Sequence, residues 1–250
     1  MKLFNFIFVA KKGAFLMLRQ LISGNMSQYY IIQLLLLVPI ILLSLSVHEF
    51  CHGYAAMKLG DDTAKNMGRL TLNPLKHLDP FGFIMLLLLG FGYAKPVPVN
   101  ARYMKNAKWG FVIVSLAGPL SNLLLAFICA LFGQLFYALS TYIPATAPAF
   151  IQIATIITSL FFALAVQLNV GYAVFNMIPI PPLDGSRLLT ACLPRSWAIF
   201  SFRYERYFQY ALLILLYLGA FTGVISTCVS AVSGFIYDVV GLIPFELLYK

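Results

Sequence analysis

The sequence predicts an all-α polytopic membrane protein with about four to six membrane segments. Two observations support this fold class. Hydrophobic residues make up 61% of the 250-residue chain and charged residues only 10%, whereas soluble domains carry about 25% charged residues. The apolar residues also form long runs, and no Asp, Glu, Lys, Arg or His occurs from Trp109 to Leu183. A water-soluble fold could not bury this much apolar surface.

Residues 1–24 predict an amphipathic helix that lies in the membrane interface. Their apolar run at residues 3–10 is too short to span a membrane, and Lys11 and Lys12 interrupt it. Phe and Leu would point into the bilayer, while the basic side chains extend to the headgroups. No small-residue cleavage site follows the run, so it does not read as a signal peptide. A substrate-gating or regulatory element is the alternative for this segment.

Four longer runs predict membrane-spanning helices, because about 20 apolar residues cross the hydrocarbon core. These runs cover residues 28–52, 109–139, 150–178 and 208–237, and residues 238–250 are expected to form an interfacial tail. Residues 81–94 are apolar but too few to span, and basic residues flank them on both sides. This pattern predicts a re-entrant hairpin. The segment Tyr93–Asn100 alternates Val and Pro, which predicts a short extended strand.

The chain shows no internal repeat and no appended soluble domain, so residues 1–250 are expected to form a single domain. Its parts would be the N-terminal segment 1–24, a core at 28–195, and a C-terminal helix and tail at 207–250. The net charge of +9 comes from basic residues at the ends of apolar runs. That placement fits anionic lipid headgroups, and no nucleic-acid-binding motif is present. The four cysteines form no CxxC pair, which predicts free thiols.

The stretch His48-Glu49-Phe50-Cys51-His52 has the clearest chemical meaning in the chain. It ends the first long apolar run, and residues four apart on a helix share one face. Two imidazoles placed this way can hold one metal ion, with Glu49 close enough to act on water beside it. A histidine pair with this spacing also occurs by chance. Ionisable groups are costly at membrane depth, however, and this favours a metal site.

A catalytic zinc site usually takes three protein ligands and leaves a fourth position for water. Of the eight acidic residues, Asp184 follows three prolines at the broken end of an apolar helix. Counting spans places that end on the same side of the membrane as His48 and His52. Asp184 is therefore the predicted third ligand. The main rival is His77, which lies in a polar loop.

Three blocks together resemble the signature motifs of the site-2 protease family of intramembrane zinc metalloproteases. The blocks are His48-Glu49-Phe50-Cys51-His52, Ala117-Gly-Pro-Leu-Ser-Asn122 and Asn176-Met-Ile-Pro-Ile-Pro-Pro-Leu-Asp184-Gly185. The likeness covers about residues 30–195, in the family's order. It is nearest to the short form of the family, which lacks PDZ and CBS domains.

The resemblance implies a zinc-dependent intramembrane endopeptidase with one zinc ion per chain. His48, His52 and Asp184 would be the metal ligands, and Glu49 the general base. Asn122 would lie near the catalytic centre, where it would stabilise the oxyanion or position the substrate. The structural alternative for Asn122 is a hydrogen bond between helices.

Asn176 and the segment Lys95–Asn100 also resemble parts of the family pattern. Asn176 would match an asparagine that precedes the ligand aspartate, although a helix-end cap explains it about as well. The segment Lys95–Asn100 resembles an extended segment to which a substrate strand could add through backbone hydrogen bonds. The sequence assigns no role to His77 or Asp79.

The implied partners are the lipid bilayer and a transmembrane protein substrate, cut in regulated intramembrane proteolysis. The implied location is the bacterial inner (plasma) membrane; nucleic acid is not expected, and the oligomeric state is not determined. Two non-proteolytic alternatives remain, a zinc-binding membrane scaffold and an ion-coupled transporter. A transporter would use His48, Glu49 and Asp184 as an ion path, but it usually shows two repeated halves, and none is visible.

Overall fold

The computed structural model describes residues 28–80, 82, 95–144 and 146–243, and this part of the chain contains helices and no β-strand. The predicted N-terminal interfacial segment, 1–24, lies outside the described residues. So does the predicted re-entrant hairpin, 81–94, apart from Gly82.

Four of the described helices are long and apolar enough to cross a membrane. They are α2 (Gln28–Lys58), α6 (Ala107–Ser140), α7 (Ala149–Asn176) and α11 (Thr222–Gly241). The predicted spans at 109–139 and 150–178 are confirmed to within two residues at each end. The first predicted span, 28–52, is also helical, but α2 continues to Lys58.

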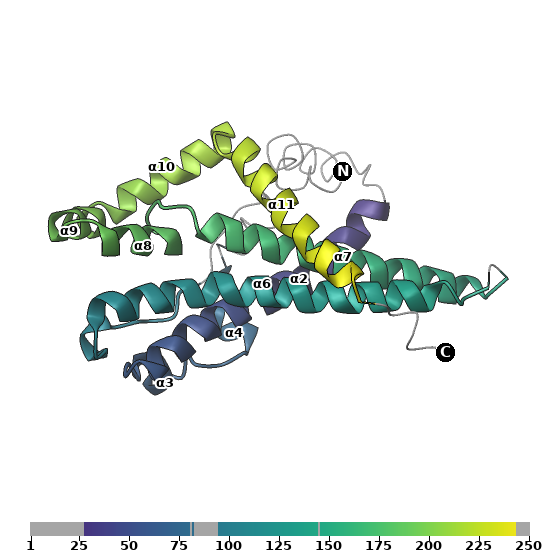
Figure 1. The fold of residues 1–250 in the computed structure, drawn as a ribbon, viewed down its shortest axis with the longest axis horizontal. Helices are drawn as coiled ribbons and strands as arrows, with labels where there is room; N and C mark the ends of the chain where they lie inside the picture. Colours follow the sequence, from purple (N-terminus) through teal and green to yellow (C-terminus); the bar gives the residue numbers. More distant parts are fainter. Residues whose placement is uncertain (1–27, 81, 83–94, 145, 244–250) are drawn as a thin grey trace.

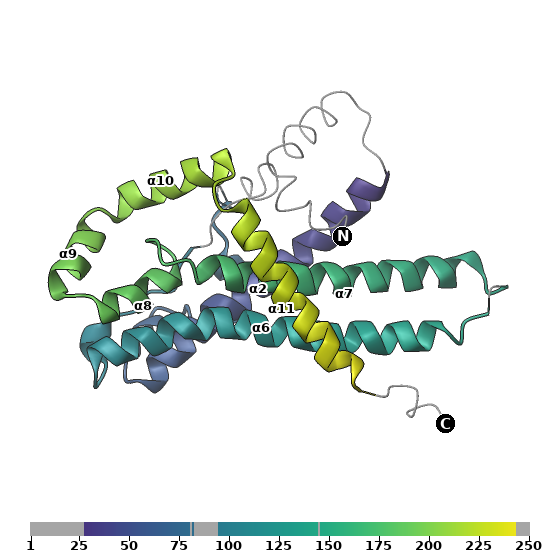
Figure 2. The same cartoon turned by 45° about the horizontal axis from the view of Figure 1, so that its top comes forward.

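The long helices pack around a shared apolar core. Helices α6 and α7 lie side by side along their length, and α11 crosses both of them (Figures 1 and 2). Helix α2 packs against α6 and α7. Small and branched side chains from all four helices form the centre of the core: Ile40, Ala126, Ala130, Val166, Val170 and Val229. Each long helix thus buries part of its apolar surface in this shared core.

Shorter helices connect these four. They are α3 (Thr63–Asn66), α4 (Pro74–His77), the 3₁₀ helix η1 (Ala101–Tyr103), α8 (Asp184–Cys192), α9 (Arg195–Arg203) and α10 (Glu205–Leu218). Asparagines cap α4, η1 and the long helix α6, because a side-chain oxygen can accept from a free N–H of the first turn. Asn73 caps α4 in this way, and Asn106 caps α6 by accepting from the N–H of Trp109 at 3.2 Å.

The predicted single span at 208–237 is wrong, because the chain breaks into α10 and α11 at Gly219. Gly219 adopts a φ of 78°, in the left-handed region that glycine enters without steric cost. Figure 2 shows α10 and α11 meeting at an angle there, with α10 directed away from α6 and α7. Hydropathy stays high across the break, so an apolar run alone did not reveal it.

The segment Lys95–Asn100 has no regular secondary structure, and hydrogen bonds hold it at both ends. The N–H of Lys95 donates to the carbonyl of His77 at 2.8 Å, and Arg69 donates to the carbonyl of Lys95 at 2.7 Å. At the other end, the N–H of Asn100 donates to Asp61 at 2.6 Å. No strand partner is seen among the described residues, so the predicted strand stays a prediction.

Candidate metal centre

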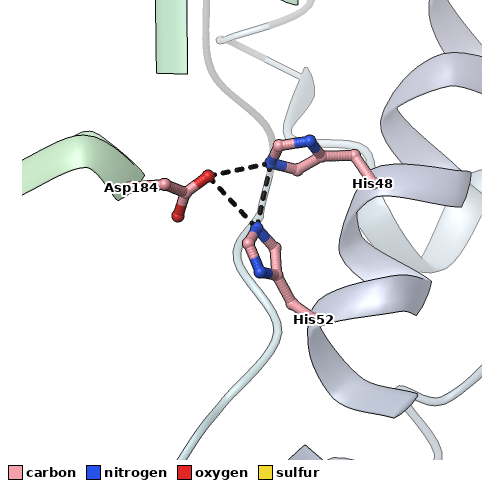
Figure 3. Close-up of side chains that lie close together, drawn as sticks. All are labelled: His48, His52 and Asp184. Carbon is pink, nitrogen blue, oxygen red and sulfur yellow. Dashed lines mark hydrogen bonds and ion pairs between the residues drawn. The ribbon is translucent and has the colours of Figure 1, made fainter. Parts of the chain in front are cut away.

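Helices α2 and α8 bring together the two predicted histidine ligands and the predicted aspartate. His48 and His52 project from adjacent turns of α2, and Asp184 points toward both imidazoles from the start of α8 (Figure 3). Oδ2 of Asp184 lies 3.2 Å from Nε2 of His48 and 3.3 Å from Nε2 of His52. The two Nε2 atoms are 3.0 Å apart. All three side chains are buried.

The chain reaches Asp184 through a proline-rich turn. Helix α7 ends at Asn176, and Pro179, Pro181 and Pro182 have no N–H with which to continue it. Asp184 then opens α8, where the free N–H groups of a first turn favour a negative charge. Packing of α8 against α6 places this carboxylate beside α2.

The surroundings of each histidine determine which nitrogen carries the proton. Nδ1 of His52 lies 2.7 Å from the carbonyl oxygen of Val114, which can only accept, so Nδ1 donates. Nδ1 of His48 lies 2.5 Å from Oδ1 of Asn122 and donates to it. In its neutral form, each imidazole would therefore present the lone pair of Nε2 to the space beside Asp184. Metal-binding histidines are usually oriented by such a second hydrogen bond.

Three electron-pair donors this close repel one another unless a cation lies between them. Zinc takes imidazole nitrogen and carboxylate oxygen at about 2.0–2.2 Å in a tetrahedral arrangement, which separates neighbouring ligand atoms by roughly 3.4 Å. The observed separations of 3.0, 3.2 and 3.3 Å approach that value. The donor set and its spacing therefore fit one zinc ion, and these residues form the one group of this kind among the described residues.

Asp184 lies outside the four long helices, as the first residue of α8. Burial alone would raise the pKa of its carboxyl. In the metal-free protein, however, hydrogen bonds from His48 and His52, each made when Nε2 carries a proton, outweigh burial and hold that pKa well below its usual range. An ionised carboxylate is the form that binds a metal ion.

Glu49, the predicted general base, follows His48 directly on α2 and is buried. Its Oε2 accepts a hydrogen bond from the backbone N–H of Val97 at 2.8 Å. The segment Lys95–Asn100 therefore contacts the carboxylate beside His48, His52 and Asp184, which are called the metal group from here on. Sequence reasoning missed this contact, because a backbone donor leaves no mark on residue identity.

Gly118 of α6 lies directly against the two imidazoles. A Cβ built on Gly118 would lie 2.3 Å from Nε2 of His52 and 2.6 Å from Cε1 of His48. Only a residue without a side chain leaves room for the two imidazoles at this position. The Ala117–Asn122 block thus contributes both this gap and the partner of His48.

Other candidates lie apart from the metal group. His77, the rival third ligand, is buried at the end of α4 and donates through Nε2 to the carbonyl of Thr71 at 2.7 Å. Asp79 accepts from the N–H of Gly82. Asn176 donates to the carbonyl of Tyr172 one turn earlier, at 3.0 Å, as a side chain at a helix end often does. All four cysteines are unpaired in the structure, so none forms a disulfide there.

Comparison with known proteins finds similarity to proteins named as zinc metalloproteases. The sequence profile of peptidase family M50 matches residues 36–219, which include every residue of the metal group. A Bacillus subtilis protein named "Putative zinc metalloprotease YwhC" is 46% identical over 169 residues, which cover 66% of this chain and 73% of that protein.

Two mycobacterial proteins named "Putative zinc metalloprotease Rip2" are more distant. The one from Mycolicibacterium smegmatis is 35% identical over 153 residues, and the one from Mycobacterium tuberculosis H37Rv is 33% identical over 150 residues. Each alignment covers 58% of this chain and 52% of the relative, so it spans about half of those proteins. No solved structure matches the chain.

Proposed function

This chain belongs to peptidase family M50, the site-2 proteases, and we propose that it cleaves transmembrane segments of other membrane proteins. With its four apolar helices it is an integral membrane protein and a zinc metalloprotease. The observation that carries the finer proposal is the convergence of His48, His52 and Asp184 beside a buried glutamate.

In this proposal Nε2 of His48, Nε2 of His52 and Oδ2 of Asp184 hold one zinc ion. Bound there, zinc would supply Lewis-acid activation of water and of the scissile carbonyl. Glu49 would take a proton from the attacking water and later deliver it to the leaving amine. The N–H of Val97 supports this role, since its hydrogen bond holds one oxygen of Glu49 in place.

We assign Asn122 to the orientation of His48. Its Oδ1 accepts from His48, and its Nδ2 lies 2.8 Å from Oδ1 of Asn169. Both ends of the amide are thus engaged, which favours a positioning role over donation to an oxyanion. The bond to Asn169 also joins α6 to α7. Asn122 therefore makes the hydrogen bond between helices that was its structural alternative, in addition to orienting His48.

The proposed substrate is a transmembrane helix that unwinds locally. Helical hydrogen bonds occupy the carbonyl that must be attacked, so residues that weaken a helix would favour cleavage. Water would reach the buried centre from the cytoplasmic side, near the basic end of α2 at Lys58. The Bacillus relative supports a place in the bacterial plasma membrane, with a role in regulated intramembrane proteolysis.

The test compares Glu49→Gln with wild type, using purified protein, a single-span model substrate in liposomes, and measured zinc content. Asp238→Asn is the matched control, because it removes an exposed carboxylate from α11. We expect zinc in all three proteins and cleavage in all but Glu49→Gln. A zinc-loaded Glu49→Gln that cleaves at the wild-type rate would overturn the general-base assignment. Ion flux without cleavage by wild type would instead indicate a transporter, and zinc binding with neither activity a scaffold.

A further inference from the structure

A line of buried polar side chains runs from α7 through α6 to His48 on α2. Asn169 and Asn122 are 1% and 0% exposed, and they lie in the uncharged stretch of the chain. Oδ1 of Asn169 accepts from Nδ2 of Asn122 at 2.8 Å, and Oδ1 of Asn122 accepts from Nδ1 of His48 at 2.5 Å. Three helices are thus joined by two consecutive side-chain hydrogen bonds.

The hydrogen bond of Asn169 to its own helix determines which atom donates in every other bond of this line. Nδ2 of Asn169 donates to the carbonyl of Ala165 at 2.9 Å, which turns Oδ1 toward α6. Asn122 must then present its NH₂ to Asn169 and its oxygen to His48. An oxygen facing Nδ1 keeps the proton on that nitrogen and leaves Nε2 of His48 free as a ligand atom.

We propose that Asn169 is a positioning residue of the metal centre, which acts through Asn122 to fix the tautomer and ring orientation of His48. This inference rests on the proposed zinc site, although it concerns metal affinity rather than proteolysis. His52 needs no such support from a side chain, because the backbone carbonyl of Val114 performs the same task. Side-chain substitution can therefore remove the hydrogen bonds that orient His48, but not the one that orients His52.

The alternative for Asn169 is helix packing alone. Amide hydrogen bonds between membrane helices stabilise their association by about 0.6–2 kcal/mol. A packing residue would affect stability wherever its bonds are lost, without a specific effect on zinc. Partners that orient metal ligands, in contrast, typically change metal affinity by about 10–100-fold when they are removed. Zinc affinity measured beside thermal stability separates these two roles.

The first experiment measures zinc affinity by chelator competition on the purified full-length protein. Asn169→Asp keeps an oxygen for Asn122 but loses the donor to Ala165. Asn169→Ser can still donate to Ala165, as serines in helices do, but is too short to reach Asn122. Asn169→Leu removes both functions. We expect an affinity within about threefold of wild type for Asn169→Asp, and about tenfold weaker for the Ser and Leu variants.

Thr155→Val is the control, since Thr155 also lies on α7 and donates to a carbonyl one turn earlier, at 2.9 Å. It should leave zinc affinity unchanged. If Asn169→Leu fails to fold, the comparison of the Ser and Asp variants still decides the question. Equal losses for Ser and Asp, or no loss for Ser, would overturn the proposal.

A second experiment asks whether Asn169 acts through Asn122. The Asn169→Ser change is introduced into an Asn122→Leu background, where the line is already broken. We expect no further loss of zinc affinity there, whereas two independent losses that multiply would contradict the relay. Zinc affinity does not depend on cleavage. If Asn169→Ser weakens zinc binding but the wild-type protein cleaves no substrate, the proposed function is refuted and this inference stands. If the wild-type protein cleaves substrate but Asn169→Ser binds zinc as tightly as wild type, this inference is refuted and the proposed function stands.

Discussion

A Cβ on Gly118 would lie 2.3 Å from Nε2 of His52, the atom that faces Asp184. No real Cβ approaches a heavy atom so closely, so either α6 or the imidazole would have to move. Packed helices resist such movement because protein interiors are close-packed. Gly118 therefore links the spacing of two helices to the geometry of the metal group.

Gly118→Ala is expected to weaken zinc binding by more than about 100-fold, since it displaces both imidazoles from Asp184. The measurement is zinc affinity of the folded, detergent-purified variant. Gly234→Ala is the control: it lies in α11, and an added Cβ there meets nothing within 4 Å. Wild-type affinity in Gly118→Ala would show that the helices separate more easily than the packing indicates.

Val97→Pro removes the backbone N–H that donates to Glu49 and changes no side chain of His48, His52 or Asp184. We expect kcat to fall by about 10–100-fold, part of the 10²–10⁴ that a positioned general base supplies. Zinc content should not change. Val97→Ala keeps the N–H and shortens the side chain, so it should retain most of the activity. Equal rates for the Pro and Ala variants would argue against a role for this hydrogen bond.

Asp61→Asn is expected to loosen the segment Lys95–Asn100. The carboxylate is fully buried and accepts from the N–H and hydroxyl of Thr63 and from the N–H of Asn100. An amide there would turn an NH₂ group against one of these donors, at a cost of about 1–3 kcal/mol. Hydrogen exchange should speed up in the segment, and cleavage should slow while zinc is retained.

Asp62→Asn is the matched control for that variant. Asp62 is the next residue but is exposed, and its ion pair with Lys65 spans 3.7 Å at the surface. Surface pairs of this kind contribute little to stability. Exchange in the segment should therefore stay as in wild type. Faster exchange in both variants would mean that charge near α3, and not the buried contact, holds the segment.

Zinc should stabilise the folded protein by an amount that grows with the logarithm of its free concentration, about 2.7 kcal/mol at 100 times the dissociation constant. We expect the Tm of chelator-stripped wild type to rise on zinc addition, and the same rise for Glu49→Gln, which removes no ligand. His52→Ala should show no rise. A zinc-dependent rise in His52→Ala would point to metal binding elsewhere in the chain.

The positions of three spans, and the meeting of His48, His52 and Asp184, could be predicted from the sequence because the causes are local or chemical. Apolar runs longer than the bilayer core must be helical, since the backbone finds no other hydrogen-bond partners in lipid. The four-residue spacing of His48 and His52 places them on one helix face. Asp184 was identifiable because a carboxylate after a proline-broken apolar helix has few structural explanations.

Contacts between distant segments were decided only by the tertiary structure. The carbonyl of Val114 and the N–H of Val97 belong to the backbone, which every residue possesses, so no residue type marks them. Asn169 could have been suspected as an amide in an apolar helix, but its partner depends on how α6 and α7 pack. The turn at Gly219 depends on a backbone angle that hydropathy does not sense. Local chemistry thus determined which residues are proposed as metal ligands, and helix packing determined the contacts that hold them in place.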